Sequence, residues 1–328
     1  MPSLTDPITE TAKILLIGDQ GHGKTGAKAA LVAAGYKLRM IDTDKGFKIL
    51  RSLLTDPHYP YADYMKKAGI TPDVSFIPID APMGVESQTI RGVQWAILAP
   101  TSSSAWNTVV KLLKEWKDGD RNLGGVADWD NDVILDFDTM STLAELAKYW
   151  VQDMNGRLGS LNDEHGRDTG GAQEMVSRLI TWITSSAVRC NVIMTSHVTW
   201  IDQTNHAAQR PEQRLREQKP VDARGFPSVI GRALSPVVGK KFNDQFIVRR
   251  TGSSASAERR IYTVPTDNTD AKNSVWLEPS YPLSTGLAEI FAALRYQDPP
   301  EDLIKAIRPD KKPDSGIQPQ RLAGGFGR

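Results

Sequence analysis

Residues 18–26, GDQGHGKTG, place a glycine-rich turn before a lysine and a threonine with the spacing G-x-x-x-x-G-K-[ST]. Glycines at 21 and 23 let the backbone take unusual φ values and approach an anion closely. The N–H groups of such a turn can surround phosphate oxygens. Lys24 would contact the β- and γ-phosphates, and Thr25 would offer its hydroxyl to Mg²⁺. The stretch therefore predicts a nucleoside triphosphate held with Mg²⁺.

The residues expected around the nucleotide share this one turn. They are Gly18, Gln20, Gly21, His22, Gly23, Lys24, Thr25 and Gly26. Within the turn, His22 has two interpretations, because its ring could touch phosphate or simply face solvent.

A phosphate-binding loop of this kind needs a carboxylate that helps to hold Mg²⁺, at the end of a neighbouring apolar strand. The segment VILD (133–136) supplies it, so we expect Asp136 to complete the metal site with Thr25. Asp138 is the alternative, because side chains two residues apart on a strand point the same way. A helix cap or a turn is the structural alternative for Asp136.

Two further polar residues stand where strands are expected to end. Asp44 follows YKLRMIDTD (36–44) and could orient or deprotonate the attacking water, or it could simply cap the turn that follows. His197 ends an apolar strand and could contact the γ-phosphate, or it could be structural. With Lys24 and Asp136, these residues form the predicted catalytic set.

The elements that would position these residues alternate between apolar strands and amphipathic helices. Strands are expected at 12–17, 36–44, 74–79, 131–139 and 191–200, and helices at 24–34, 105–116, 143–150 and 176–187. This alternation predicts an α/β fold, a mostly parallel sheet covered by helices on both faces, with ligands at the carboxyl ends of the strands. The six prolines between 51 and 104 suggest an irregular insertion.

Length and composition describe an ordinary globular chain. It has 328 residues, a net charge of +1 and a single cysteine, Cys190, which excludes an internal disulfide and a Cys-based zinc site. No signal pattern or membrane-length apolar run is present, so we expect a cytoplasmic protein without membrane contact. The expected domains are a tail at 1–11, a core at 12–280, helices at 281–309 and a disordered tail at 310–328.

Positive charge is concentrated late in the chain. Between residues 201 and 260 there are 12 Lys and Arg against 6 Asp and Glu, in a chain whose total is only +1. Basic mobile loops suit sequence-independent binding of phosphate backbones, although a solvated loop would have the same composition.

The chain resembles RecA-type ATPases, and more closely the phage-encoded RecA-like single-strand annealing recombinases. The matching strings are, in order, GDQGHGKTG, MIDTDKG, VILDFDTMSTLAELA, the helix EMVSRLITWITSSAVRC with NVIMTSHVTW, and RRIYTVPTDNTDAKNSV. The resemblance spans about residues 12–277. It implies ATP hydrolysis at subunit interfaces of a ring or filament and binding of single-stranded DNA. At the position of Asp44 such proteins commonly carry Glu, so the shorter Asp weakens the case for a general base.

The resemblance also implies roles for residues beyond the phosphate loop. Lys272 would reach the ATP of a neighbouring subunit, or else be a surface lysine. Apart from the resemblance, the tandem Arg259-Arg260 in the basic run could contact DNA or could equally be an arginine finger. DNA contacts would come from two loops, at 155–171 and 201–226. The second of these lies within a basic loop at 201–230. The expected DNA-binding residues are Arg157, Arg167, Arg210, Arg214, Arg216, Lys219 and Arg224.

The leading prediction is a Mg-dependent ATPase that assembles on single-stranded DNA and promotes annealing or recombination in phage DNA metabolism. A single-strand-binding or replication protein is a further expected partner, and the host cytoplasm would be the location. A helicase or packaging motor and a nucleotide-controlled switch with little turnover are the alternatives. A signalling GTPase is disfavoured because no Asn-Lys-x-Asp guanine-reading motif is present.

Overall fold

The fold is described from a computed structural model. The structure describes residues 11–308, except for 91, 162–165, 203–222, 232, 253–256 and 267.

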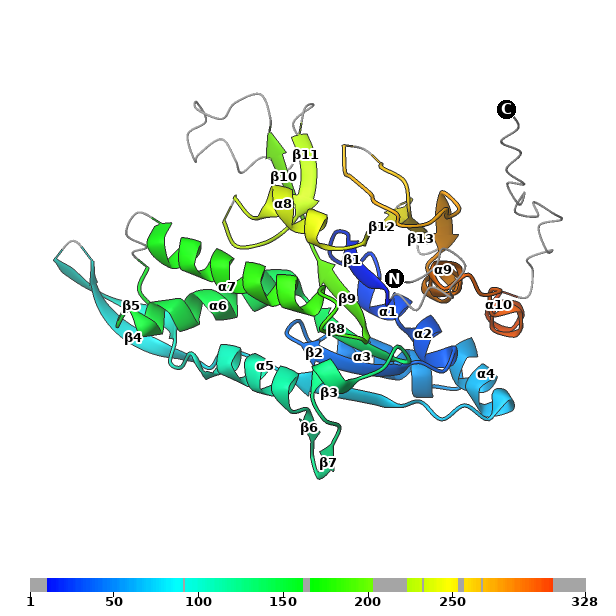
Figure 1. The fold of residues 1–328 in the computed structure, drawn as a ribbon. Coiled ribbons are helices and arrows are strands. Elements are labelled where there is room, and N and C mark those ends of the chain that lie inside the picture. Colours follow the sequence, from blue (N-terminus) through cyan, green and yellow to red (C-terminus); the bar gives the residue numbers. More distant parts are fainter. Residues whose placement is uncertain are drawn as a thin grey trace, which may run out of the picture.

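An eight-stranded sheet forms the centre of the molecule, in the order β14-β13-β12-β1-β9-β8-β2-β3 (Figure 1). The strands from β12 to β3 are mutually parallel, and β13 and β14 continue the sheet antiparallel. Their bounds are β1 Lys13–Ile17, β2 Lys37–Asp42, β3 Val74–Pro78, β8 Val133–Asp138, β9 Asn191–Ser196, β12 Asp244–Thr251, β13 Glu258–Tyr262 and β14 Ser280–Pro282. The predicted fold class, a mostly parallel sheet covered on both faces, is confirmed.

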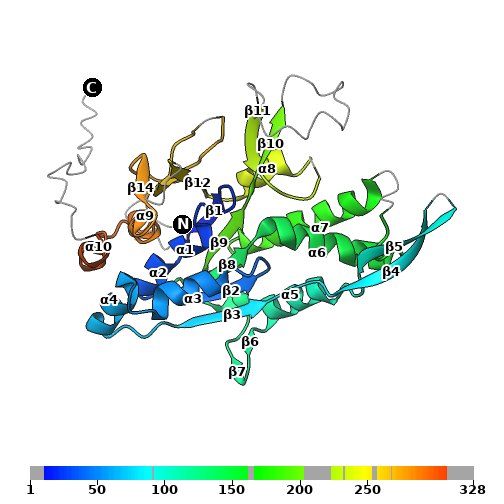
Figure 2. The same cartoon turned by 180° about the vertical axis from the view of Figure 1, so that it is seen from behind.

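Helices cover the two faces of the sheet, as Figures 1 and 2 show from opposite sides. The helices are α1 Lys24–Ala27, α2 Ala29–Ala33, α3 Phe47–Thr55, α4 Pro60–Ala68, α5 Ser104–Lys114, α6 Met140–Met154, α7 Arg167–Ile183, α8 Ser235–Val238, α9 Gly286–Leu294 and α10 Glu301–Ile307. Short 3₁₀ turns lie at Val126–Asp128 and Gly239–Lys241.

The alternation of side chains along each strand builds two cores. On β1, Leu15 and Ile17 pack with α5, α6 and α7, whereas Ile14 and Leu16 pack with α1 to α4, α9 and α10. Every residue of β1 is buried. A strand buried on both faces is expected to be apolar, as β1 is from Ile14 to Ile17. The buried Lys13 at its start donates to Val188 O and Cys190 O.

The described residues of the segment 51–104 form regular helices and strands, so its predicted irregularity is wrong. It contains most of α3, all of α4 and strand β3, which pairs parallel with β2 at the edge of the main sheet. A long hairpin follows, β4 Met83–Ile90 and β5 Val93–Pro100. The prolines mark element ends: Pro60 begins α4, Pro78 ends β3 and Pro100 ends β5, positions where a missing N–H costs little.

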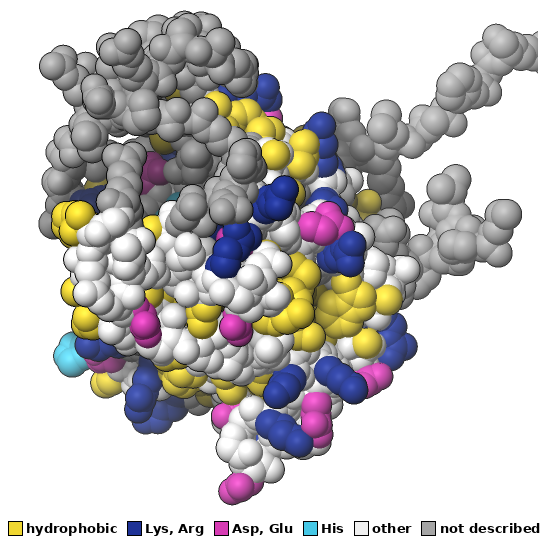
Figure 3. Space-filling view, turned by 90° about the vertical axis from the view of Figure 1, so that its left-hand side faces the viewer, with side chains coloured by type: hydrophobic (Ala, Val, Ile, Leu, Met, Phe, Trp, Pro, Cys, Tyr) yellow, Lys and Arg dark blue, Asp and Glu magenta, His cyan; other side chains and the backbone are white. Residues whose placement is uncertain are grey.

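Three hairpins project from this core. They are β4–β5, the short β6 Lys117–Asp118 with β7 Arg121–Asn122, and β10 Val198–Asp202 with β11 Ala223–Pro227. Apolar side chains remain exposed on β4–β5, including Val85 at 75% and Leu98 at 72%. The space-filling view from that side shows apolar patches among Lys and Arg side chains (Figure 3).

The strand expected at 191–200 is divided in two. β9 ends at Ser196, inside the sheet, and β10 begins at Val198 and leaves it, so that His197 stands at the break. The expected C-terminal helices correspond to α9 and α10, which join the core beside α2 and α4. No described helix is long and apolar enough to cross a membrane.

Candidate nucleotide site

The predicted phosphate-binding turn connects β1 to α1, as the motif requires. Gly21 and Gly23 have φ values of +76° and +100°, in the region that favours glycine. Their N–H groups donate to no described protein acceptor, whereas the N–H of Gly18 bonds to Ser196 O at 3.1 Å. Gln20 is exposed, and Gly26 is half-buried beside Leu53. The turn is therefore a cradle whose free N–H groups suit an anion.

The start of this cradle packs tightly on β12. A Cβ on Gly18 would lie 2.5 Å from Val248 O, and His22 Nδ1 lies 3.0 Å from the same carbonyl. His22 thus tethers the turn to β12, which supports a structural interpretation of this histidine more than direct contact with phosphate.

We expect Gly18→Ala to lower the free energy of unfolding by about 2 to 3 kcal/mol, because the added methyl group meets a backbone carbonyl that cannot move freely. Gly21→Ala is the matched control. Nothing lies within 4 Å of its Cβ position, so only left-handed strain of about 1 kcal/mol is expected. Urea unfolding of both variants measures the difference, and an equal or larger cost at Gly21 would contradict this packing.

Lys24 is buried at the base of the cradle. Its Nζ donates to Gly18 O at 2.7 Å and to Asp19 O at 3.0 Å. An ammonium has three donors, so one direction remains for a phosphate oxygen. Burial lowers the pKa of Lys24 to about 8, although the carboxylates of Asp138 and Asp19 act in the opposite direction.

The carboxylate that meets Thr25 is that of Asp138. Thr25 Oγ1 donates to Asp138 Oδ2 at 2.5 Å, and Thr195 Oγ1 donates to Asp138 Oδ1 at 2.6 Å. Asp136 instead accepts from Lys28 Nζ at 2.6 Å and is fully buried. The geometry therefore favours Asp138, the alternative of the sequence prediction, as the partner of Thr25. One hydroxyl and one carboxylate are oxygen ligands of the kind that Mg²⁺ uses beside phosphate.

Lys28, which was not among the residues predicted from the sequence, links the two carboxylates. Its ammonium lies 2.6 Å from Asp136 and 3.1 Å from Asp138, with all three side chains buried. Burial alone would lower the pKa of Lys28, but the two carboxylates outweigh it and raise that pKa. Burial raises the pKa of Asp136 to about 7, against the effect of Lys28. The spacing in the sequence could have indicated this role, because Lys28 lies one helical turn after Lys24 and therefore on the same side of the helix.

Burial would likewise raise the pKa of Asp138, but the Lys28 charge and the Thr195 and Thr25 hydroxyls outweigh it and hold that pKa below its usual range. Asp138 is thus the carboxylate that stays ionised, as a metal ligand must.

A second overlooked feature is the turn that follows β2. Asp42 accepts hydrogen bonds from the N–H groups of Asp44, Gly46 and Phe47, and so fixes the turn. A Cβ on Gly46 would lie 2.9 Å from Thr25 Oγ1 and 3.0 Å from Asp138 Oδ2. The turn therefore reaches the Thr25–Asp138 pair, and only glycine permits that approach.

Asp44 and His197, predicted from separate strand ends, come together. Their carboxylate and Nε2 atoms are 3.8 Å apart, and Asp44 is half-exposed. Burial and the nearby Asp138 raise the pKa of Asp44, partly opposed by His197 and Lys24. Burial and the Lys24 charge lower the pKa of His197. The lowered pKa of His197 favours a neutral imidazole beside the Asp44 carboxyl group near neutral pH.

We expect Asp44→Asn to reduce ATP turnover on the order of 10²- to 10⁴-fold with nucleotide affinity little changed, because an amide cannot accept a proton from water. In the wild type, turnover should fall with decreasing pH along a limb that lies above the ordinary aspartate pKa, since the folded pKa is raised. Steady-state rates from pH 4 to 8 test both statements. Unchanged turnover in Asp44→Asn would remove Asp44 from the catalytic set.

The expected DNA-binding residues divide into three groups. Arg210, Arg214, Arg216 and Lys219 lie outside the described residues. Arg157 donates to buried Asp168 at 2.7 Å, and Arg224 pairs with Asp270, so both are engaged within the chain. Arg167 begins α7 and is exposed. Among the described members, Arg167 alone fits an exposed contact without a change of partner.

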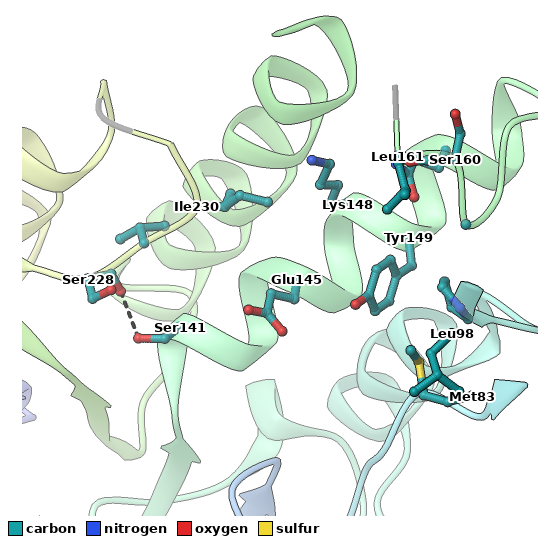
Figure 4. Close-up of a pocket in the computed structure, with 14 residues that line it drawn as sticks. Met83, Leu98, Ser141, Glu145, Lys148, Tyr149, Ser160, Leu161, Ser228 and Ile230 are labelled. Carbon is teal, nitrogen blue, oxygen red and sulfur yellow. Dashed lines mark hydrogen bonds between the residues drawn. The ribbon is translucent and has the colours of Figure 1, made fainter. Parts of the chain in front are cut away.

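The first predicted DNA loop and the segment just after the second border one groove of about 410 Å³ (Figure 4). Gly159, Ser160 and Leu161 line it from the first loop, and Ser228, Val229 and Ile230 line it from the segment after β11. Helix α6 and the base of β4–β5 complete the walls. Segments far apart in the sequence thus meet at this groove. Apolar, polar and charged side chains line it together, so its surface is not predominantly basic.

The residues expected to act on a neighbouring subunit also contact their own chain. Lys272 Nζ donates to Phe242 O at 2.7 Å, and Arg260 pairs with Glu258 at 2.6 Å and donates to Ser280. Arg259 lies beside Gly23 of its own phosphate loop, with its Cδ 3.2 Å from the position of a Gly23 Cβ. The predicted tandem therefore separates into two environments.

The parallel sheet, the glycine cradle on β1 and the polar residues gathered at the neighbouring strand ends define an α/β core of the P-loop class. A family model described as an AAA domain (AAA_24) matches residues 10–275. The chain belongs to this AAA-domain family.

Other comparisons add similarity of fold only. The structure of the RadB recombinase is 12% identical in sequence, and the match covers 77% of this chain and 80% of the RadB chain, with a TM-score of 0.35. A KaiC-like protein of Pyrococcus horikoshii is 10% identical, and the match covers 83% of this chain and 84% of that protein, with a TM-score of 0.33. The flagellar accessory protein FlaH of Methanocaldococcus jannaschii is 10% identical, and the match covers 84% of this chain and 81% of that protein, with a TM-score of 0.31. No curated protein matches. Similarity at this level says nothing about function.

Proposed function

We propose that this protein is a Mg-dependent ATPase that binds single-stranded DNA, assembles with itself, and promotes annealing or recombination in phage DNA metabolism. The observation that carries the catalytic part is the meeting of Thr25 with Asp138 and of Asp44 with His197 beside the same cradle.

The chain's own residues divide the work at the nucleotide. The free N–H groups of Gly21 and Gly23 and the ammonium of Lys24 would bind phosphate, and Thr25 with Asp138 would hold Mg²⁺. When bound, Mg²⁺ neutralises charge that develops on the phosphates. Asp44 would accept the proton of the attacking water, and neutral His197 would orient the carboxylate.

Contacts between the site and the β10–β11 hairpin favour coupling to DNA. His197 directly precedes β10, and the N–H of Ser228, just after β11, donates to His197 O at 2.7 Å. Ser196 Oγ and Ser141 Oγ both donate to Ser228 O at 3.0 Å. A displacement of His197 would therefore move the foot of the hairpin, whose two strands are joined in the sequence by the segment 203–222 with Arg210, Arg214, Arg216 and Lys219.

The test is steady-state ATP hydrolysis without DNA, with single-stranded DNA and with duplex, using Lys24→Ala as the blank. We expect stimulation chiefly by single strands. Replacing Arg214 and Arg216 together by alanine should weaken DNA binding and reduce the slope of log affinity against log salt by about 1 to 2, because each phosphate contact releases counterions. Arg178→Ala, exposed on α7, is the matched control.

Two other outcomes point elsewhere. Rates indifferent to DNA would overturn the proposed coupling. Tight ATP binding with negligible turnover would favour a nucleotide-controlled switch, which the short and half-exposed Asp44 makes a specific second candidate.

A further inference from the structure

Arg259 and Leu283 form a wall against the phosphate loop of their own chain. A Cβ on Gly23 would lie 3.2 Å from Arg259 Cδ, 3.8 Å from its Nε and 2.5 Å from Leu283 Cδ2. The N–H of Leu283 donates to Arg259 O at 2.9 Å, which holds the two residues together. The Arg259 side chain therefore runs past the residue whose N–H group forms part of the cradle.

The sheet also gathers positive charge at this place. Pairing of β12 with β13 sets Arg249 opposite Arg260, and Arg250 opposite Arg259. Like charges directly opposite on a sheet are destabilising. Arg260 is compensated by Glu258, whereas exposed Arg259 forms no ion pair with any described residue. Arg259 thus retains an uncompensated guanidinium within reach of the loop.

We propose that Arg259 binds the phosphate chain of the nucleotide held by its own P-loop, acting in cis rather than on a neighbouring subunit. This inference rests on the proposed ATP-binding function. A guanidinium presents a planar fork of donors that matches phosphate oxygens. The cradle supplies the neutral N–H donors, Lys24 supplies one cation from below, and Arg259 supplies a second from the β13 side.

The test is competition binding, in which ATP and inorganic triphosphate each displace a fluorescent N-methylanthraniloyl ADP. Arg259→Met keeps an unbranched stem against Gly23 and removes the charge. We expect it to bind both competitors about tenfold more weakly, the effect of one charge-assisted hydrogen bond. Arg259→Lys should recover part of the affinity. Leu283→Ala changes the packing on the same glycine without changing charge. In a Leu283→Ala background, the difference in affinity between Arg259→Met and Arg259→Lys should stay the same.

Each outcome decides the proposal. Weaker ATP with unchanged triphosphate would overturn it and place Arg259 at the base or ribose. Unchanged affinity for both would make it a surface arginine. Normal binding by Lys24→Ala would instead overturn the proposed function itself, independently of Arg259.

Mixing Arg259→Ala with Lys24→Ala separates cis from trans action. A residue acting in trans would be supplied by the Lys24→Ala subunits to intact neighbouring loops, and hydrolysis would recover. We expect no recovery, because each active loop would still lack its own Arg259. Recovery of hydrolysis in proportion to the interfaces that pair an intact Lys24 loop with an intact Arg259 would overturn the assignment in cis.

Discussion

Lys24→Ala should abolish measurable ATP hydrolysis, with a loss on the order of 10³-fold, and should weaken ATP binding strongly. Removal of a single preorganised donor in a site shielded from water costs about 10²- to 10³-fold. Lys24 is additionally the cation at the base of the cradle, positioned by Gly18 O and Asp19 O. Lys24→Arg should not restore activity, because a planar guanidinium does not fit a position built for a buried ammonium.

The pH dependence of binding gives an independent test of Lys24. Its pKa is lowered to about 8, so the ammonium is present below that pH and is lost as pH rises through it. Wild-type affinity for ATP should therefore fall above about pH 8, and Lys24→Ala should lack this limb. Lys111→Ala, exposed on α5, is the control and should match the wild type. A Lys24→Ala protein that hydrolyses ATP normally would rule out this cradle as the active site.

Asp138→Asn should have the second largest effect, a loss of Mg-dependent hydrolysis on the order of 10²- to 10³-fold. The amide keeps the size of the side chain and can still accept from Thr195 or Thr25, so the fold should survive. It cannot supply the negative oxygen that Mg²⁺ prefers beside Thr25. The measurement is the rate as a function of Mg²⁺ concentration, with thermal unfolding as a check on folding.

Asp136→Asn is the matched comparison, because it removes the neighbouring carboxylate on the same strand. Asp136 faces Lys28 and, with its pKa raised to about 7, is already partly protonated near neutral pH. We expect its rate to stay within about tenfold of the wild type, because Lys28 retains Asp138 as a partner. If Asp136→Asn lost more Mg-dependent hydrolysis than Asp138→Asn, the metal ligand would be Asp136, as first predicted from the sequence.

Much of the frame of the site could be predicted from the sequence. The spacing of Gly18, Gly23, Lys24 and Thr25 after an apolar run specifies a local turn between a strand and a helix, and local geometry needs only neighbouring residues. The periodicity of the strands and helices likewise predicted a mostly parallel sheet covered on both faces. Prolines misled the prediction for 51–104, because the same residue that breaks an element also begins or ends one.

Tertiary structure alone decided which of the gathered residues touch. Asp136 and Asp138 are equivalent on a strand pattern. They are distinguished by Thr25, which meets Asp138 across 113 residues of chain, and by Lys28, which lies closer to Asp136 across 108 residues. The approach of Gly46 to Thr25 and of Arg259 to Gly23 likewise depends on how distant strands are ordered in the sheet. By itself, then, the sequence determined the phosphate cradle, the class of fold and the strand ends where chemistry would gather. The pairing of charges at those ends was set by packing, because electrostatic partners are chosen by three-dimensional proximity and burial, neither of which is written in local spacing.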